Sequence, residues 1–288
     1  MSPINILFYA GVLFGWSTSW LPLSWQLGTV APEVSLFWRF LMAAPMMAVL
    51  ALFFGQPLRF DYRVHWRFAA LGLCIFSGNF ALFYHAGSGV TSGLLAVVFS
   101  TASLVNVMMG ALIDRTRPPM LHVMAALVGV SGVAMLYWPE LKMSDTALQN
   151  LVFCLVGTLF FCTGNLVSQN SQQRGIPVFA SAAWGMLYGT CYLGVFSVLM
   201  GHEFIIDPTV RYLGSLVWLT VVSSVLTFSC YLLLIGRIGA SRAGYATVLF
   251  PVFALLLSTV FEDYHWSLHG MIGLGFVLTG NLIMIRAR

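Results

Sequence analysis

Long apolar runs recur along the whole chain, and each is close to the length that crosses a lipid bilayer. A membrane-spanning helix needs about 20 predominantly apolar residues, whereas the strands of a membrane barrel have about 9–11 residues and alternate in polarity. The runs therefore predict helices, which satisfy their own backbone hydrogen bonds in lipid. The ten predicted spans are 5–27, 34–54, 67–86, 91–113, 119–138, 148–170, 177–200, 212–235, 241–261 and 266–286.

Six of the ten predicted helices carry polar and aromatic side chains at the helical spacing of three or four residues. Such stripes predict a central cavity lined by these six helices and braced by the second, fifth, seventh and tenth, which are more uniformly apolar or glycine-rich. Packing between helices is the alternative interpretation of each stripe. The candidate substrate-binding residues are Trp16, Ser19, Trp20, Asn79, Phe83, Phe99, Ser103, Asn165, Ser224, Phe228, Tyr231 and Tyr245.

Two prolines interrupt the predicted spans. Pro22 cannot donate a hydrogen bond to the carbonyl of Thr18, and Pro251 cannot donate one to the carbonyl of Thr247. Each proline leaves a carbonyl oxygen that a neighbouring side chain, water or a ligand must satisfy at membrane depth. Such kinks are candidate hinges for a conformational change, and static kinks packed against neighbouring helices are the alternative.

The two halves of the chain resemble each other at an offset of 146 residues. Residues 13–20 (LFGWSTSW) align in this way with residues 159–166 (LFFCTGNL). Chance similarity between apolar helices is the alternative, although further matches keep the same order along the chain. We therefore predict two repeats, 1–143 and 144–288, with five helices each. The odd number inverts the second repeat in the membrane, a transporter plan whose substrate site lies near the midplane.

Composition and charge support a membrane location and give an orientation. Of the 288 residues, 59% are hydrophobic and 8% are charged, against roughly 25% charged in a soluble domain. Ten spans place both termini on one side. If that side is the cytoplasm, ten of the thirteen Lys and Arg residues lie in cytoplasmic segments, which is the preferred side for positive charge. The arginines are spread over short segments and form no patch that would bind nucleic acid.

Charge is scarce inside the predicted spans. No Asp, Glu or Lys falls at the centre of a predicted helix, and the only charge clearly inside one is Arg39. We expect Arg39 to have a structural role, reaching toward the outer end or capping a helix, with carboxylate binding as the alternative. An uncharged, aromatic-lined cavity suits a neutral or zwitterionic solute with a flat apolar part, because rings stack on such a solute.

The remaining reactive residues predict neither metal binding nor catalysis. The five cysteines lie within predicted helices, without CxxC spacing or a histidine at ligand spacing, so we expect packing roles, no metal and no cofactor. His85, at the outer end of the third span, is the one histidine placed to titrate near a pathway. The chain has no HExxH or GxSxG motif, which argues against the alternative of an intramembrane enzyme.

Three segments resemble a known transporter family. They are RFLMAAP (39–45), AGYATVLFPVFALLLSTVFED (243–263) and GMIGLGFVLTGNLI (270–283). They are similar to the drug/metabolite transporter superfamily in its ten-helix form with two EamA-type repeats. Pro251 and Glu262 match a typical motif of that family, and Thr101 stands where the first repeat would have a proline. The chain resembles bacterial aromatic amino acid exporters most, which implies an inner-membrane exporter of phenylalanine, tyrosine or tryptophan.

These observations lead to one functional hypothesis and several alternatives. We expect an exporter of aromatic amino acids or similar neutral or zwitterionic amphipathic metabolites, working by alternating access in a bacterial inner membrane. Exchange of phosphorylated metabolites or nucleotide-sugars is an alternative that needs a basic cavity, and export of other drugs is another. The energy source and the oligomeric state stay open. Trp16, Phe83, Phe99, Phe228 and Tyr245 would contact the ring, and Asn79, Ser103, Asn165 and Ser224 the polar ends.

Overall fold

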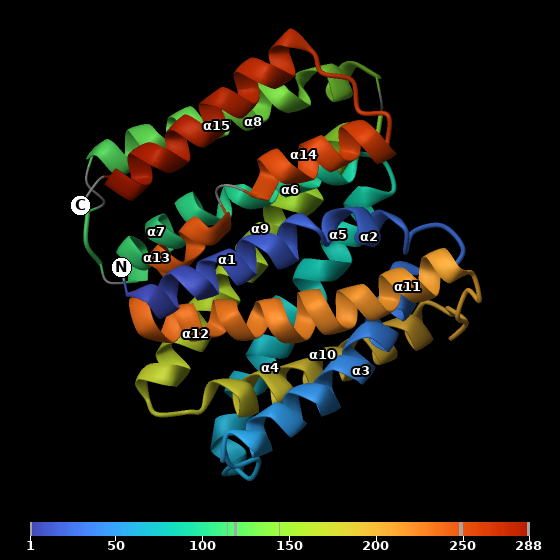
Figure 1. Cartoon of the computed structure of the whole chain (residues 1–288), viewed down its shortest axis with the longest axis vertical. Coiled ribbons are helices and arrows are strands. Elements are labelled where there is room, and N and C mark those ends of the chain that lie inside the picture. The colour runs from blue at the N-terminus through green and yellow to red at the C-terminus, as the bar shows by residue number, and fades with distance from the viewer. Residues whose placement is uncertain (1, 114, 118–119, 144, 248–249, 287–288) are drawn as a thin grey trace.

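The computed structural model consists of helices and connecting loops (Figure 1). It describes residues 2–113, 115–117, 120–143, 145–247 and 250–286, and the side chains of 140–143, 245 and 284–286 lie outside this description. The described part contains no strand, which confirms the all-helical prediction. The helices are α1 (Pro3–Ser17), α2 (Trp20–Ser24), α3 (Pro32–Phe53), α4 (Tyr62–Leu73), η1 (Cys74–Gly78), α5 (Asn79–Gly87), α6 (Ser92–Ser100), α7 (Ala102–Ile113), α8 (Met120–Met143), α9 (Ala147–Gln173), α10 (Val178–Leu199), α11 (Val210–Trp218), η2 (Leu219–Thr227), α12 (Phe228–Ile238), α13 (Ala240–Ala243), η3 (Gly244–Thr247), α14 (Phe250–Phe261) and α15 (Leu268–Arg286).

Within the described residues, eight helical segments are long and apolar enough to cross a membrane. They are Pro3–Ser24, Pro32–Phe53, Tyr62–Gly87, Ser92–Ile113, Met120–Pro139, Ala147–Gln173, Val178–Leu199 and Val210–Ile238. Two further apolar helices, Phe250–Phe261 and Leu268–Ile283, are shorter. The predicted spans thus correspond to eight segments of full crossing length and two shorter ones, and ten crossings stay a prediction.

The outer surface of the bundle is apolar. Large side chains such as Phe53, Leu112 and Val210 are 80%, 78% and 88% exposed. Soluble monomers rarely expose large contiguous apolar patches, because water solvates them poorly. Lipid tails are an equally apolar solvent for these side chains, so the exposed surface agrees with a multi-pass membrane protein.

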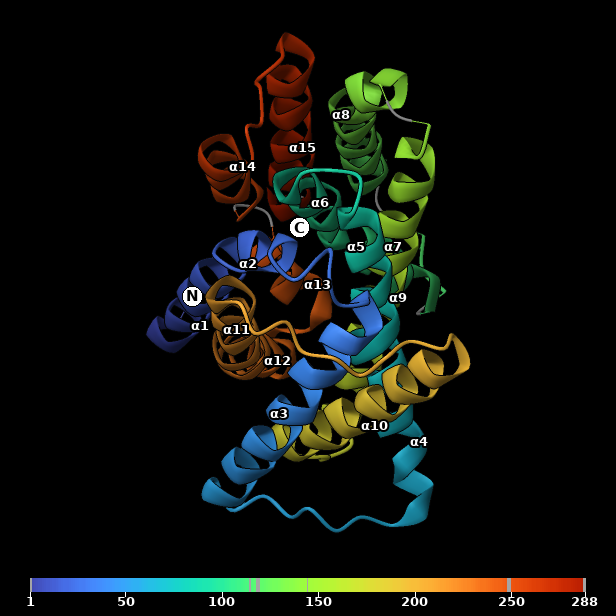
Figure 2. The same cartoon turned by 90° about the vertical axis from the view of Figure 1, so that its right-hand side faces the viewer.

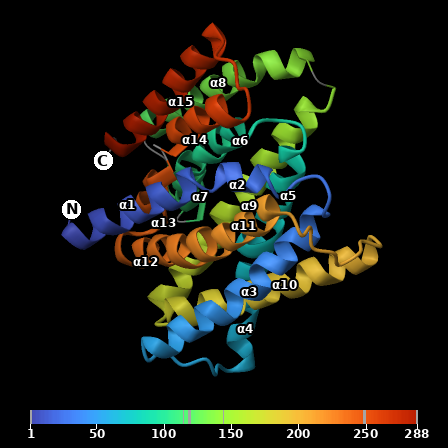
Figure 3. The ribbon, with the colours of Figure 1, turned by 45° about the vertical axis from the view of Figure 1, so that its right-hand side comes forward.

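The helices form layers across the bundle. α8 and α15 make one side, α3, α4 and α10 make the opposite side, and α1, α9 and α12 lie between them (Figures 1 and 2). The intermediate view in Figure 3 shows the same order, with α1 and α12 side by side in the middle layer. α1 begins and α15 ends on the same side, hereafter the termini side, and the other side is called the far side (Figure 1).

The contacts between helices repeat when the first five spans are exchanged with the last five. α3 packs on α10 and α8 packs on α15, which pairs the second span with the seventh and the fifth with the tenth. α1 packs on α12, which is a contact between the first and eighth spans, and α5 packs on α9, which is a contact between the third and sixth. Exchanging the first span with the sixth and the third with the eighth turns one contact into the other. Two repeats related by a two-fold axis produce this pattern. It brings these four spans to the centre.

α8 and α15 approach each other through glycines. A Cβ atom at Gly132 would lie 2.5 Å from the carbonyl oxygen of Gly273, and one at Gly280 would lie 2.7 Å from the carbonyl oxygen of Ala125. Small residues let membrane helices pack backbone against backbone, where dispersion contacts hold them together. The glycine-rich fifth and tenth spans therefore brace one side of the bundle, as their composition predicts.

The first and fourth spans are interrupted part-way along their length. α1 ends at Ser17 and α2 begins at Trp20, so the break precedes Pro22 by one turn, where its missing N–H weakens the helix. The fourth span breaks at Thr101, between α6 and α7, although no proline stands there. The hydroxyl of Thr101 donates instead to the carbonyl of Val98 at 2.6 Å, which tightens the turn at the break.

The prediction of one continuous helix over 241–261 is wrong. α13 and the 3-10 helix η3 come first, and α14 begins at Phe250. Gly239 precedes this segment with φ of 83°, a left-handed conformation that ends α12. Pro251 is the second described residue of α14, and residues 248–249 before it lie outside the described structure. The ninth span is therefore not one α-helix, because the 3-10 helix η3 precedes α14.

Two spans contain π-helical segments at corresponding positions. η1 covers Cys74–Gly78, and adding the repeat offset of 146 gives 220–224, which lies inside η2 (Leu219–Thr227). π-helical turns are rare and occur frequently at functional sites, because the extra residue per turn shifts the direction of the following side chains. Asn79 directly follows η1, and Ser223 and Ser224 belong to η2.

Candidate functional site

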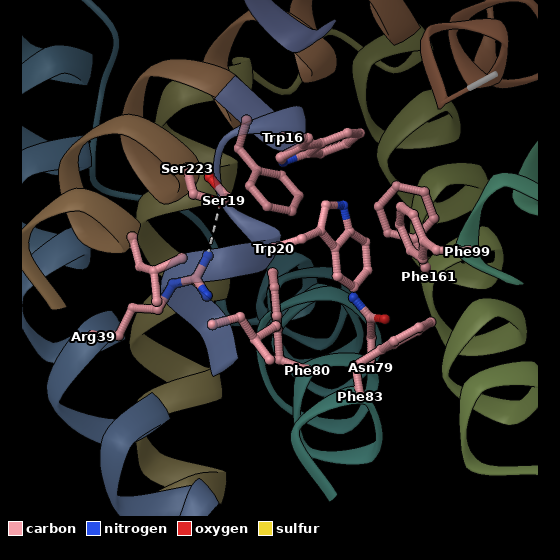
Figure 4. Close-up of a pocket in the computed structure, with 13 residues that line it drawn as sticks. Trp16, Ser19, Trp20, Arg39, Asn79, Phe80, Phe83, Phe99, Phe161 and Ser223 are labelled. Atoms are coloured by element: carbon pink, nitrogen blue, oxygen red, sulfur yellow. Dashed lines mark hydrogen bonds between the residues drawn. The ribbon is translucent and has the colours of Figure 1, made fainter. Parts of the chain in front are cut away.

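A cavity lies where the interrupted and π-helical spans meet (Figure 4). Thirteen residues line it, and they come from the first, second, third, fourth, sixth and eighth spans. The sequence predicts five of these spans at the cavity. The second span, predicted as a brace, contributes Arg39, so that part of the prediction is wrong. The ninth span contributes Phe250, whose ring contacts the lining rings from behind.

Trp16 lies at the centre of a cluster of aromatic rings. Its indole centroid is 4.8 Å from that of Tyr231 and 5.3 Å from that of Phe228. The rings of Phe161 and Phe99 follow at 5.9 and 6.0 Å in edge-to-face arrangement. Such pairs contribute about 0.5–1.5 kcal/mol each beyond their buried area, so the cluster holds four spans together.

Trp20 forms a second centre on the other side of the break between α1 and α2. Its ring stacks on Phe250 with a centroid distance of 5.9 Å and an interplanar angle of 19°. It also meets Phe83 and Phe99, each at 5.7 Å. The break thus divides the first span between two tryptophans whose rings both line the cavity (Figure 4).

The free space between the lining side chains is small. Its volume is about 40 Å³, which accommodates only a few water molecules. Pockets that bury a drug-sized ligand have about 300–1,000 Å³. An aromatic solute therefore enters only if rings such as Trp16 and Trp20 move apart.

Arg39 is fully enclosed beside this space. Its side chain is 1% exposed, which rules out the expected reach toward the outer end of the span. Nε donates to the hydroxyl of Ser224 at 2.8 Å, and Nη2 donates to the hydroxyl of Ser223 at 3.1 Å. The guanidinium also lies over the ring of Phe80, 4.5 Å from its centroid. The prediction of an uncharged cavity is therefore wrong, because a buried cation lines it.

Two further polar residues face the cavity. Asn79 is 2% exposed, and its Oδ1 atom is buried without a hydrogen-bond partner among the described residues. Ser19, at the break, donates its hydroxyl to the carbonyl of Gly15 in the preceding turn. Seven of the twelve candidate residues line the cavity: Trp16, Ser19, Trp20, Asn79, Phe83, Phe99 and Phe228.

Four of the other candidates lie behind the lining. Ser224 holds Arg39, and Tyr231 packs on Trp16 and accepts a hydrogen bond from Nδ2 of Asn165 at 2.9 Å. Asn165 is 0% exposed and does not line the cavity. Ser103 donates its hydroxyl to Oδ1 of Asn281, joining the fourth span to the tenth. The side chain of Tyr245 lies outside the described residues.

Sequence reasoning missed several lining residues. Phe161 lies four residues before Asn165, so both share one face of α9, and this spacing was a usable signal. Ser223 and Phe80 adjoin candidates but point to the cavity because the π-helical segments rotate the helix. That rotation leaves no mark in the hydrophobic pattern.

Polar contacts close the bundle on the termini side of the cavity. Arg237 donates from Nε to Oδ1 of Asn5 at 2.8 Å, which ties α12 to α1. The backbone N–H of Ala240 donates to Oε1 of Gln169 at 2.7 Å, which ties α13 to α9. The first bond joins the two repeats and the second lies within the second repeat, and both lie between the cavity and the termini side.

A second set of polar contacts closes the far side. Glu262 directly follows α14. Its Oε2 atom accepts hydrogen bonds from Ser92 at the start of α6 and from Ser258 within α14. Nε2 of His85 donates to Oε1 of Glu33 at 2.5 Å, and His202 lies 3.6 Å from the same carboxylate. His85, predicted to titrate near a pathway, thus belongs to a cluster that joins α3 to the end of α5 and the loop after α10.

Both halves of the chain match the model of the EamA-like transporter family, over residues 3–138 and 149–286. The chain belongs to this family. It is a multi-pass membrane transporter with the family's two-repeat architecture. The family assignment favours transport over the alternative of an intramembrane enzyme.

Curated relatives and a solved structure are similar over nearly the whole length. Protein PagO of Salmonella typhimurium is 21% identical, covering 99% of this chain and 93% of that protein. The uncharacterized transporter YoaV of Bacillus subtilis is 22% identical, covering 93% of this chain and 90% of that protein. One crystal structure of a protein has a TM-score of 0.74 at 18% identity, covering 98% and 97% of the two chains, which shows a shared fold.

Proposed function

We propose that this EamA-like transporter exports aromatic amino acids, or similar neutral or zwitterionic amphipathic metabolites, across a bacterial inner membrane. The observation that carries the proposal is the ring cluster around the cavity. Trp16 and Trp20 line it together with Phe83, Phe99 and Phe161. A flat apolar solute gains stacking and edge contacts from such rings. Aliphatic or small side chains at these five positions would offer no such contacts.

The two closed sides support alternating access. Arg237 and Asn5 on the termini side, and Glu262 and Ser92 on the far side, hold the cavity between two polar layers. A carrier must break one layer at a time, so that the solute meets water on one side only. We propose Pro22 and Pro251 as hinges, since Pro22 lies in the helix after the break that follows Ser17 and Pro251 lies in the helix after the 3-10 segment η3. Both termini would face the cytoplasm.

The repeats are the moving units of this proposal. We place their boundary between residues 143 and 144, in the connection between α8 and α9. α1 packs on α12, and α5 packs on α9, so each of these pairs joins a helix of one repeat to a helix of the other. Each repeat therefore contributes to both sides of the cavity. Rocking one repeat against the other would therefore open the cavity to alternate sides without unfolding a span.

Exchange of phosphorylated metabolites is less well supported. A dianionic substrate needs several cations in the cavity, and Arg39 is the only one that lines it among the described residues. The next most buried arginine, Arg67, donates to Oδ1 of Asn170 at 2.8 Å near the start of α4, on the termini side. Arg67 therefore binds a neighbouring helix.

Counterflow of labelled tryptophan in proteoliposomes tests the proposal. The wild-type protein should accumulate label against unlabelled tryptophan, and Trp16→Ala should lower the apparent affinity by about tenfold, because the solute loses its central ring contact. Trp66→Ala is the matched control, since Trp66 is 58% exposed and is not among the lining residues. Unchanged counterflow in Trp16→Ala, or none in the wild type, would refute the proposal. Repeating the assay with a pH gradient distinguishes proton coupling from facilitated diffusion.

A further inference from the structure

Arg39 is a buried cation without an anionic partner. Among the described residues, the ion pairs involve Glu33 with His85 and His202, and none involves Arg39. Its guanidinium instead meets two serine hydroxyls and two aromatic faces. Removing a charge from water is costly when hydroxyls alone replace the solvent, so a lone buried arginine inside a membrane bundle marks a functional site more often than a structural one.

One nitrogen of this guanidinium is free to bind a ligand. Nη1 is buried and has no hydrogen-bond partner in the described part of the chain, although Nε and Nη2 both donate to serines. The Tyr84 hydroxyl lies close by, at a geometry outside that of a hydrogen bond. The two serine bonds fix the plane of the guanidinium, which presents the remaining donor beside the cavity (Figure 4).

Asn79 supplies the complementary group. Its Oδ1 atom is a buried acceptor without a partner in the described structure, and the residue lines the same cavity from α5. A carboxylate accepts from a guanidinium, and an ammonium donates to an amide oxygen, so these two groups offer one partner each to the carboxylate and the ammonium at the polar end of an α-amino acid. The rings of Trp16 and Trp20 line the same cavity as Arg39 and Asn79.

We propose that Arg39 binds the carboxylate of the transported solute and that Asn79 accepts a hydrogen bond from its ammonium group. The substrate class is then an α-amino acid with an aromatic side chain, and aromatic amines or neutral aromatics are poor substrates. This inference rests on the proposed function, because it assigns the polar end of the same solute. It gives Arg39 the carboxylate-binding role, which the sequence analysis treats as the alternative to a structural role.

A purely structural Arg39 would behave differently. As a pin between α3 and η2 it would need only its bonds to Ser223 and Ser224, and the solute's carboxylate would not affect affinity. The two roles are separated by the solute, since tryptophanamide keeps the ring and the ammonium but lacks the carboxylate charge. Indole-3-propionate keeps the ring and the carboxylate but lacks the ammonium.

The test is competition against labelled tryptophan counterflow by unlabelled tryptophan, tryptophanamide and indole-3-propionate. In the wild type, tryptophanamide should compete about tenfold more weakly than tryptophan or worse, because a charge-assisted hydrogen bond is lost. Indole-3-propionate should also compete more weakly, through Asn79. In Arg39→Gln, the difference between tryptophan and tryptophanamide should fall to about threefold or less, while Arg39→Lys should keep part of it.

Controls separate folding and the proposed function from this inference. Arg67→Gln removes another buried guanidinium that bonds to neutral side chains, and it should leave the ratio of the two affinities unchanged. Equal competition by tryptophan and tryptophanamide in the wild type overturns the role of Arg39 even if no variant folds, and leaves tryptophan export standing. Absence of tryptophan counterflow in the wild type overturns both proposals.

Discussion

Glu262 and Ser92 join the end of α14 to the start of α6 through two hydrogen bonds. Oε2 of Glu262 accepts from the backbone N–H of Ser92 at 3.0 Å and from its hydroxyl at 2.8 Å. The carboxylate thus sits at a helix N-terminus, where unpaired N–H groups and the helix dipole favour negative charge. Ser258 adds its hydroxyl to the same oxygen. The glutamate of the family motif is therefore a lock between the fourth and ninth spans.

Glu262→Gln should weaken this lock. The amide keeps the shape but loses the charge, so we expect the free energy of unfolding to fall by about 1 kcal/mol, given that the residue is partly exposed. Thermal denaturation in detergent measures the change. Asp263→Asn is the matched control, because Asp263 is exposed and asparagine tolerates its φ of 53°. An equal loss in both variants would show that the effect comes from net charge.

Pro22→Ala should slow transport with little effect on affinity. Alanine restores the N–H that can donate to the carbonyl of Thr18, which favours a continuous helix across the break between α1 and α2. We expect a lower maximal counterflow rate, by about threefold or more, at a similar half-saturating concentration. Pro45→Ala is the control, since Pro45 lies inside α3, which continues through it. A raised rate in Pro22→Ala would contradict a hinge at this break.

Ser103→Ala should lower stability and leave tryptophan affinity unchanged. Ser103 donates to Asn281 between α7 and α15, and the alanine leaves the amide oxygen of Asn281 buried without its donor. An unsatisfied buried polar group costs about 1–3 kcal/mol. Melting temperature and competition assays on one preparation separate the two effects. A change in affinity at unchanged melting temperature would return Ser103 to the binding site.

Gly132→Ala should separate α8 from α15. The added Cβ would lie 2.5 Å from the carbonyl oxygen of Gly273, a backbone atom that cannot move alone. We expect a loss of about 2–3 kcal/mol in the free energy of unfolding, typical of overpacking. Gly275→Ala is the matched control, because an added Cβ there meets nothing within 4 Å. Equal melting temperatures for the two variants would contradict the close packing of these helices.

The apolar pattern predicts the helices well but not their interruptions. Runs of about 20 apolar residues suffice because lipid permits few alternatives to a helix. Pro22 marks the break in the first span. The break at Thr101 and the π-helical segments η1 and η2 have no proline to mark them in the sequence. The apolar run of the ninth span likewise does not mark the change from α13 to the 3-10 helix η3 within it.

The candidate site could be predicted in outline. Trp16, Trp20 and Asn79 were found because polar and aromatic groups at helical spacing need a partner away from lipid. The sequence favours a structural role for Arg39 because a single charge near a span end can reach water, and only the packing of α3 against η2 shows that it does not. Ser103 and Asn165 belong to polar stripes of the same kind on their own helices. Their side chains form hydrogen bonds with Asn281 and Tyr231 on other helices.

The most direct test of the central claim is photolabelling with a diazirine analogue of tryptophan, followed by mass spectrometry of the modified peptides. Binding between the central rings predicts labels within 16–20 and 79–83 that excess unlabelled tryptophan suppresses. Labels confined to the apolar groove lined by Leu104, Met108 and Val130, or labels that tryptophan leaves unchanged, would contradict a substrate site around Trp16 and Trp20.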